Sequence, residues 1–223
     1  MSAKKTQRGP SLFEVALGAA LSVALGCAVG AALLLIKPVL KVKEIPKDAP
    51  ANAVYYIEGN RDFNRTAEVT DKRKAFAGGE SVDLSEGELN VLFSAIGSKP
   101  AAGAPKPGEK PPEPRAIDLS GLNARIHDGR LQLADTLTVS LFGATGTFIV
   151  QASGAFEKGA SGFEFVPDVF YVGGCPMQRL PIIKDILLKK FLLGQPVPDD
   201  LVAAWPKLAA VSIEGSTLRL KMP

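Results

Sequence analysis

The chain is poor in the residues that build metal centres and disulfide frameworks. Its 223 residues include one histidine and two cysteines. These numbers exclude an ordinary transition-metal site, which needs several imidazole or thiolate ligands. Cys27 lies in a long apolar run and Cys175 in the remainder of the chain, so the two cannot bridge within one chain.

Catalytic motifs are also missing. The only histidine, His127, lies in a predicted turn, and no Gly-x-Ser-x-Gly nucleophile elbow occurs. The glycine-rich turns lack the Lys-Ser/Thr that follows a phosphate-binding loop. The paired carboxylates Glu86/Glu88 and Asp199/Asp200 fit dipole compensation at the start of a helix. We therefore predict no enzyme activity, catalytic residue, metal site or cofactor.

Neither sign of charge dominates the composition. The formal net charge is +3, and the lysines and arginines are scattered along the chain instead of forming a stripe. A nucleic-acid-binding domain carries a basic face. We therefore predict that nucleic acid is not a partner of this protein.

What the chain does have is one long uncharged segment. Residues 15–36 carry no charge, and basic residues flank both ends. At about 1.5 Å of rise per residue, such a helix reaches about 33 Å, and a hydrocarbon core is about 30 Å thick. We predict a transmembrane helix over residues 15–36 that follows a cytoplasmic tail of residues 1–14.

Two other interpretations of this segment stay open. A cleaved signal peptide has a shorter apolar region, of about 7–15 residues, before a small-residue cleavage site. Ala24-Leu25-Gly26-Cys27 loosely matches a lipoprotein signal, but the residues after Cys27 stay strongly apolar instead of forming a polar tether. The length of the run therefore favours a permanent anchor.

The positive charges on the two flanks nearly balance, so the positive-inside rule does not decide the orientation. The N-terminal tail is too short to fold, and the simplest topology keeps it in the cytosol. We then expect a single-pass protein of the inner (cytoplasmic) membrane. Residues 37–53 would form a stalk, and residues 54–223 one domain outside the cytoplasm.

Small residues recur every four positions along the apolar run. Gly18, Ser22, Gly26 and Gly30 fall on one helix face. This is the small-xxx-small pattern that lets two membrane helices approach closely. It fits a homodimer through the span, and equally the general abundance of glycine and alanine in membrane helices.

The domain is predicted to be α+β. Residues 62–76 have helix-compatible spacing, and Ser85 and Glu88 stand in the relation of a capping box at the start of the next helix. Residues 97–115 hold six prolines among Gly, Ala, Lys and Glu. That composition cannot bury a core and predicts a solvated Pro-rich loop.

From residue 117 the hydrophobic period changes to two, which is typical of strands. Asp128-Gly129 predicts a tight turn, because this pair supplies positive φ angles. Consecutive strands with short turns predict an antiparallel meander, which we expect to form a curved sheet packed on helices. The predicted strands are residues 117–126, 130–142, 147–156, 163–172, 211–214 and 217–222.

Residues 181–193 predict a helix that is apolar on nearly every side. Its lysines, Lys184, Lys189 and Lys190, do not gather on one polar face. Such a helix needs burial on more than one side. The pattern favours contact with protein all round. The alternative is that one flank lines a groove for a lipid-like molecule or touches the bilayer.

The order of elements resembles a known family. Ser85-Glu86-Gly87-Glu88-Leu89-Asn90 opens a helix before the meander. Residues 168–176, Asp-Val-Phe-Tyr-Val-Gly-Gly-Cys-Pro, lead into the apolar helix, and an Ile-Glu-Gly-Ser-Thr-Leu-Arg-Leu hairpin ends the chain. Over roughly residues 54–223 this looks like the small bacterial envelope proteins that are similar to tubular lipid-binding (TULIP) domains. The resemblance implies a curved sheet around a long helix, with an apolar ligand between them.

We therefore expect a membrane-anchored envelope protein whose exported domain binds an apolar or lipid-like ligand. The alternative is a non-enzymatic envelope scaffold or assembly factor that dimerises through its span and recruits a protein partner. The candidate ligand-binding residues are Phe148, Val150, Phe163, Phe165, Ile183, Leu187 and Phe191.

Overall fold

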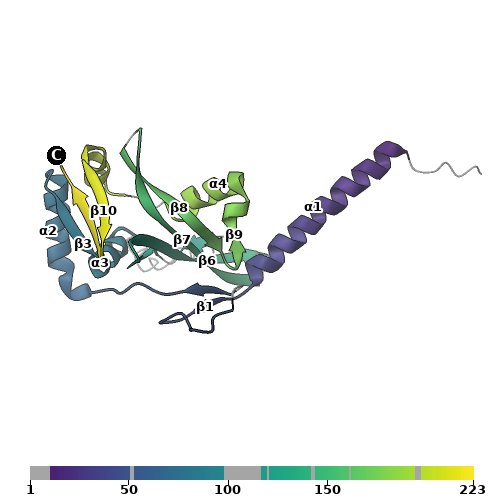
Figure 1. Cartoon of the computed structure of the whole chain (residues 1–223), viewed down its shortest axis with the longest axis horizontal. Coiled ribbons are helices and arrows are strands. Elements are labelled where there is room, and N and C mark those ends of the chain that lie inside the picture. Colours follow the sequence, from purple (N-terminus) through teal and green to yellow (C-terminus); the bar gives the residue numbers. More distant parts are fainter. Residues whose placement is uncertain are drawn as a thin grey trace, which may run out of the picture.

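The chain forms an α+β structure with an apolar N-terminal helix and antiparallel sheets (Figure 1). The computed structural model describes residues 11–50, 53–97, 117–119, 121–141, 144–160, 162–193 and 197–223. The predicted Pro-rich loop, apart from its first residue, lies outside the described residues. Helix α1 projects from one end of the body, and α2 and the C-terminus lie at the opposite end (Figure 1).

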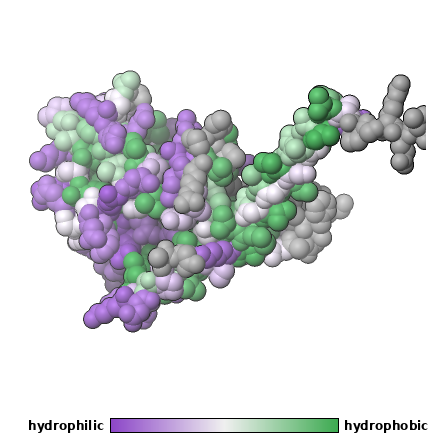
Figure 2. Space-filling view, turned by 45° about the vertical axis from the view of Figure 1, so that its right-hand side comes forward, coloured by the Kyte–Doolittle hydropathy of each residue, from purple (hydrophilic) through white to green (hydrophobic). Residues whose placement is uncertain are grey.

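Helix α1 (Leu12–Ile36) begins three residues before the predicted start because a capping box defines its first turn. The Ser11 hydroxyl accepts a hydrogen bond from the Glu14 amide at 3.2 Å, and the Glu14 carboxylate accepts one from the Ser11 amide at 2.7 Å. The helix has no buried residue and is long and apolar enough to cross a membrane. Figure 2 shows it as a mostly hydrophobic rod beside a body with a largely hydrophilic surface.

The end of α1 is held against the body by a glycine turn. Gly173 and Gly174 lie directly under the last residues of the helix, and Gly173 has a φ of +57°. A Cβ at Gly173 would lie 2.3 Å from the Leu35 carbonyl oxygen, and one at Gly174 would lie 2.9 Å from that of Leu34. Only glycine fits this close approach, so the turn sets how α1 leaves the domain.

The segment expected as a stalk contains a strand. β1 (Val39–Lys41) pairs in parallel with β2 (Val54–Tyr56), with Val39 opposite Val54. A strand of three residues is too short to show a period in the sequence. Because of this pairing, the chain joins the folded body directly after α1.

The main sheet confirms the predicted meander. Its strand order is β4-β6-β7-β8-β9, with β5 also paired to β6, and all of these pairs are antiparallel. Asp128 and Gly129 have positive φ angles of 51° and 70°, which confirms the tight turn. The strands are β4 (Ile117–Leu119), β5 (Asn123–His127), β6 (Arg130–Leu141), β7 (Ala144–Gly159), β8 (Gly162–Val172) and β9 (Cys175–Pro176).

The strand predicted over residues 117–126 is divided into β4 and β5. Gly121 lies between them with a φ of +126°, and its amide donates a hydrogen bond to the Asp135 carboxylate at 3.0 Å. This left-handed residue breaks the extended backbone, so β4 and β5 pair with different parts of β6.

A second sheet has the order β10-β11-β3, and it joins the predicted closing hairpin to a strand from the middle of the chain. Its strands are β3 (Val82–Ser85), β10 (Ala210–Glu214) and β11 (Thr217–Lys221). The helices of the body are η1 (Phe63–Arg65), α2 (Thr66–Ala77), α3 (Glu86–Gly97), η2 (Met177–Arg179), α4 (Pro181–Phe191), α5 (Asp199–Ala204) and η3 (Trp205–Lys207).

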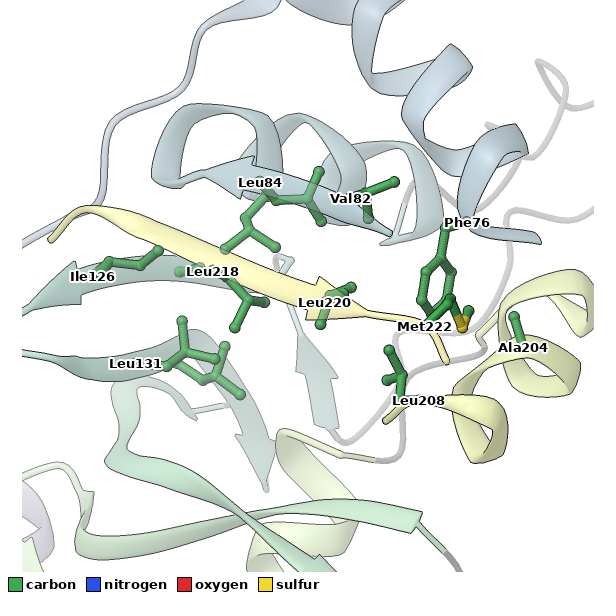
Figure 3. Packing of buried hydrophobic residues seen from close by; sticks show 13 residues of the cluster. Phe76, Val82, Leu84, Ile126, Leu131, Ala204, Leu208, Leu218, Leu220 and Met222 are labelled. Carbon is green, nitrogen blue, oxygen red and sulfur yellow. The ribbon is translucent and has the colours of Figure 1, made fainter. Parts of the chain in front are cut away.

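The buried apolar side chains form two clusters. The first cluster lies between the two sheets and helices α2, α3 and α5, and includes Leu84, Leu131 and Leu218. In Figure 3, Leu84 of β3 and Leu218 of β11 lie on one side of this cluster, and Leu131 of β6 lies on the other. The second cluster lies where α4 packs on β6, β7 and β8, and includes Val150 and Phe170.

Candidate apolar ligand site

The first cluster encloses a cavity of about 500 Å³. Helices α2, α3 and α5 and strands β3, β6, β8 and β11 contribute its walls. The lining side chains are apolar except for Lys72 and Arg73. They are Val69, Lys72, Arg73, Phe76, Val82, Leu84, Leu89, Leu92, Phe93, Ile96, Leu122, Leu131, Leu133, Phe156, Phe165, Leu192, Leu193, Val197, Leu201, Val202, Trp205, Pro206, Leu218 and Leu220.

Both cations at the cavity wall are neutralised by carboxylates. The Lys72 ammonium donates to the Glu88 carboxylate at 2.8 Å and to the Asp83 carbonyl at 2.9 Å. Arg73 forms a bidentate pair with Asp200 at 2.8 and 3.0 Å, which connects α2 to α5 and lowers the pKa of Asp200. A ligand in this cavity therefore meets apolar walls and no uncompensated positive charge.

Glu88 is the buried centre of the polar network behind the cavity, with 1% of its surface exposed. Burial alone would raise its pKa. The hydrogen bonds from Lys72 and from the amide and hydroxyl of Ser85 outweigh that effect and lower the pKa to about 2. The predicted capping box is confirmed, because the Glu88 amide also donates to the Ser85 hydroxyl at 3.4 Å. Glu88 therefore joins α2 to the start of α3.

The other polar residues of the Ser85–Asn90 motif support the edge of β5. The Asn90 side chain accepts from the Ala124 amide at 2.6 Å and donates to the Ala124 carbonyl at 2.7 Å. Glu86 accepts from the Ile126 amide at 2.8 Å. These side chains make the hydrogen bonds to the edge of β5 that a neighbouring strand would otherwise make. The motif therefore positions α3 against the sheet.

Aromatic side chains form one wall of the cavity. Trp205 donates its indole N–H to the Phe163 carbonyl at 2.7 Å. Its ring lies 5.9 Å from that of Phe156, which meets Phe165 edge to face at 5.8 Å. Phe156 and Trp205 were not predicted as ligand-lining residues. The alternation of phenylalanines on the two strands is the signal that points to Phe156.

The cavity reaches the surface beside α4 and α5. Leu193, Val197 and Val202 line it and are each about half exposed. Leu193 follows α4, Val197 precedes α5, and Val202 lies within α5. These three side chains form an apolar rim of the cavity.

The predicted ligand-binding residues lie in different places. Phe165 lines the cavity, and Phe163 packs against the first cluster beside it. Phe148, Val150 and Leu187 belong to the second cluster or pack on it, and Val150 is 0% exposed. The side chains of Ile183 and Phe191 lie outside the described residues.

Helix α4 is not in contact with protein on every side, so that expectation is wrong. Leu188 and Leu192 are buried, but Ile186 is 60% exposed. The helix packs one flank on the second cluster and leaves the other open. The sequence pattern misled because apolar residues occupy both flanks, and apolarity alone does not say what covers them.

The small-residue face of α1 is open. A Cβ added at Gly18, Gly26 or Gly30 would meet no atom within 4 Å, and the Ser22 hydroxyl donates to the Gly18 carbonyl at 2.8 Å within the same helix. A second helix could approach this face closely. The homodimer through the span stays a prediction.

Two other features of the surface carry polar side chains. A wider hollow between α2 and the second sheet is lined by charged residues such as Asp71, Asp83 and Arg219, and it lies open to solvent. His127 is exposed, and its Nε2 lies 3.1 Å from Asp128. Among the described residues, no group of three His, Cys, Asp or Glu side chains could hold a metal ion.

Comparison with known proteins adds no relative. No protein-family model matches the chain, and no curated protein or solved structure matches it. The functional assignment therefore depends on the geometry of the cavity and on the properties of α1.

Proposed function

We propose that this chain is a single-pass inner-membrane protein whose domain, outside the cytoplasm, binds the apolar part of a lipid-like ligand. The observation that carries the proposal is the cavity of about 500 Å³ inside the first cluster. Protein interiors are normally filled to crystal density, and an empty apolar space sacrifices contacts among its walls. A ligand that fills the space restores those contacts.

The lining indicates the chemistry of the ligand. The cavity volume lies within the range of small-molecule pockets, which is about 300–1,000 Å³. Its walls supply apolar and aromatic surface. The two cations at the wall, Lys72 and Arg73, are already paired with the carboxylates of Glu88 and Asp200. A hydrocarbon chain gains about 0.8 kcal/mol for each methylene that it buries. We propose a long acyl chain or a similar hydrocarbon, with its polar group left at the rim.

Two further observations support a role at a membrane. Helix α1 has the length and composition of a span, and the glycine turn at Gly173-Gly174 connects its end firmly to the domain. A TULIP-like domain, which we expect from the order of elements, would bind the same class of ligand. An anchored carrier of this kind would bind lipid at or near the membrane that holds it.

The single tryptophan offers a direct test. Trp205 lies in the cavity wall, so a bound dibrominated stearic acid should quench its fluorescence in full-length protein held in nanodiscs. The Leu92→Phe substitution fills part of the cavity and should weaken the quenching several-fold. Val169→Phe, on the exposed side of β8 and away from the cavity, is the matched control and should leave it unchanged.

Native mass spectrometry of the purified chain tests the same proposal without an added probe. The mass spectrum of the wild-type protein should show a bound lipid-like molecule, and the fraction of protein that carries it should be lower in the Leu92→Phe variant. If the wild type is always empty and its tryptophan is never quenched, the ligand-binding proposal is wrong. A scaffold or assembly factor would then be the better hypothesis.

A further inference from the structure

The exposed flank of α4 combines apolar and basic side chains. Ile186, Lys189 and Lys190 follow the spacing i, i+3 and i+4, which places them on one face of α4, and Leu193 comes two residues after the helix ends. All four are exposed. The opposite face is anchored by Leu188 and Leu192, which are buried in the second cluster. The helix is therefore held rigidly while this face is presented outward.

The charge of this region is positive. Lys184 lies 3.6 Å from Asp185, and these two charges offset each other. Lys189 and Lys190 form no ion pair with any described residue, so two positive charges remain beside Ile186. Lysines next to exposed apolar side chains are typical of helices that lie in the interface of a membrane with anionic lipid.

The path of α1 brings α4 to the membrane side of the domain. The end of α1 rests on the Gly173-Gly174 turn between β8 and β9, and η2 and α4 follow directly after β9. Figure 1 shows α4 and β9 beside the base of α1, with α2 at the far end of the body. A bilayer that contains α1 therefore begins next to α4.

The same helix leads to the mouth of the cavity. Leu192 and Leu193, directly after α4, line the cavity, and Leu193 belongs to its apolar rim. A surface that covers the outward face of α4 would thus reach the rim as well. A hydrocarbon chain could then pass between bilayer and cavity with little exposure to water.

We propose that α4 docks on the surface of an anionic bilayer through Ile186, Lys189 and Lys190, together with Leu193 after the helix, and so holds the cavity rim against the lipid. This deepens the proposed function and rests on α1 being the membrane anchor. The apolar side chains enter the interface, and the two lysines meet the headgroups. The occupant of this face is lipid, because Leu35 at the end of α1 and Leu188 of α4 pack on the same second cluster, which keeps the face close to the membrane that would contain α1.

Depth-dependent fluorescence quenching tests the docking in the full-length chain. An environment-sensitive fluorophore is attached at Ile186→Cys in a Cys27→Ser background, and the protein is reconstituted into vesicles of phosphatidylcholine and phosphatidylglycerol. Lipids with a headgroup nitroxide should quench this probe strongly. The same probe at Glu80→Cys, an exposed position that follows α2 at the far end of the body, is the control and should be quenched little.

Charge reversal sharpens the test. Lys189→Glu with Lys190→Glu should lower the docked-to-free ratio on the order of tenfold or more, because each lysine contributes about 1 kcal/mol near an anionic surface. Lys74→Glu with Lys207→Glu makes the same change in net charge on exposed residues outside α4 and should have little effect. Vesicles of phosphatidylcholine alone should also reduce docking.

The outcomes separate docking from ligand binding. Equal quenching at positions 186 and 80, while Trp205 is still quenched by brominated fatty acid, would overturn the docking and leave the proposed function standing. Strong quenching at position 186 in a protein whose cavity stays empty would support the docking and overturn the carrier function. If a protein partner covered α4 instead, the position 186 probe would be shielded without depending on anionic lipid, and this would also overturn the docking.

Discussion

The two apolar clusters of the domain are built from similar residues but are packed differently. In the second cluster, Val150 and Phe170 are at most 1% exposed and lie in close contact between α4 and the main sheet. The first cluster has a larger set of leucines and phenylalanines, yet it surrounds a cavity of about 500 Å³. Hydrophobic composition therefore does not explain the hollow.

The two clusters differ in which elements surround them and in how those elements are joined. The second cluster is a helix packed on one continuous sheet. The walls of the first cluster come from two separate sheets and three helices, and polar contacts join them, including Lys72–Glu88 and Arg73–Asp200. A polar network whose members are all hydrogen-bonded makes the elements that it joins more rigid. The walls of the first cluster are thus joined by polar contacts, whereas the second cluster holds α4 on the sheet through Leu188 and Leu192.

Truncating one phenylalanine in each cluster tests this contrast most strongly. Phe170→Ala removes a fully buried ring from the filled cluster and should lower the free energy of unfolding by about 4 kcal/mol. Phe93→Ala removes a half-buried ring that packs on the first cluster and lines its cavity, and should lower it by about 2 kcal/mol. Denaturant unfolding of the detergent-solubilised chain measures both. Equal losses would show that the two clusters do not differ in packing.

A bound ligand should raise the free energy of unfolding through contacts in the cavity of the first cluster. At about one hundred times its dissociation constant, a fatty acid should raise the free energy of unfolding by about 2.7 kcal/mol. Leu92→Phe should abolish most of this gain, because the ring occupies the same space. Thermal unfolding with and without stearic acid is the measurement. A gain that persists in Leu92→Phe, as in the Val169→Phe control, would place the ligand elsewhere.

Removing the charge of Glu88 tests whether polar contacts hold the hollow open. Glu88→Gln weakens the bond to Lys72 and should lower the free energy of unfolding by about 2 kcal/mol at neutral pH. The pKa of Glu88 is lowered from 4.5 to about 2, so its contribution is complete above pH 4.5 and is lost as the pH falls toward 2.

The pH profile of Glu88→Gln separates this effect from general acid denaturation. Between pH 4.5 and 2 the wild type should lose more stability than the variant. Asp71→Asn, which removes an exposed carboxylate 3.8 Å from Lys74, is the control and should keep the wild-type profile. Parallel profiles for wild type and Glu88→Gln would mean that Glu88 contributes nothing in this range.

Local chemistry made much of the fold predictable. The Asp128-Gly129 turn, the Ser85–Glu88 capping box and the closing hairpin each depend on a few neighbouring residues, and the structure confirms them. The pairing of β3 with β11 and of β1 with β2 was not predicted. These contacts join distant segments, and the sequence carries no local signal for which strands become neighbours.

The candidate site was less predictable for the same reason. Phe165 was predicted as a ligand-binding residue and lines the cavity, but its partners on the cavity wall come from α2, α3, α5 and the second sheet. Periodicity shows which face of an element is apolar, and it cannot show whether that face meets a filled or an empty space. Val150 illustrates this limit, because its inward face is in the filled cluster.

Helix α1 extends the contrast to a surface that the domain does not cover, and substitutions there should affect the stability of the domain least. If the small-residue face pairs two spans, Ser22→Cys in a Cys27→Ser background should form a disulfide dimer in native membranes. Gly26→Leu with Gly30→Leu should reduce that dimer several-fold, because close approach of the helices is blocked. Ala24→Leu with Ala28→Leu places two leucines on the opposite face and should spare the dimer. Equal dimer in all three backgrounds would show that the open face of α1 does not carry an interface.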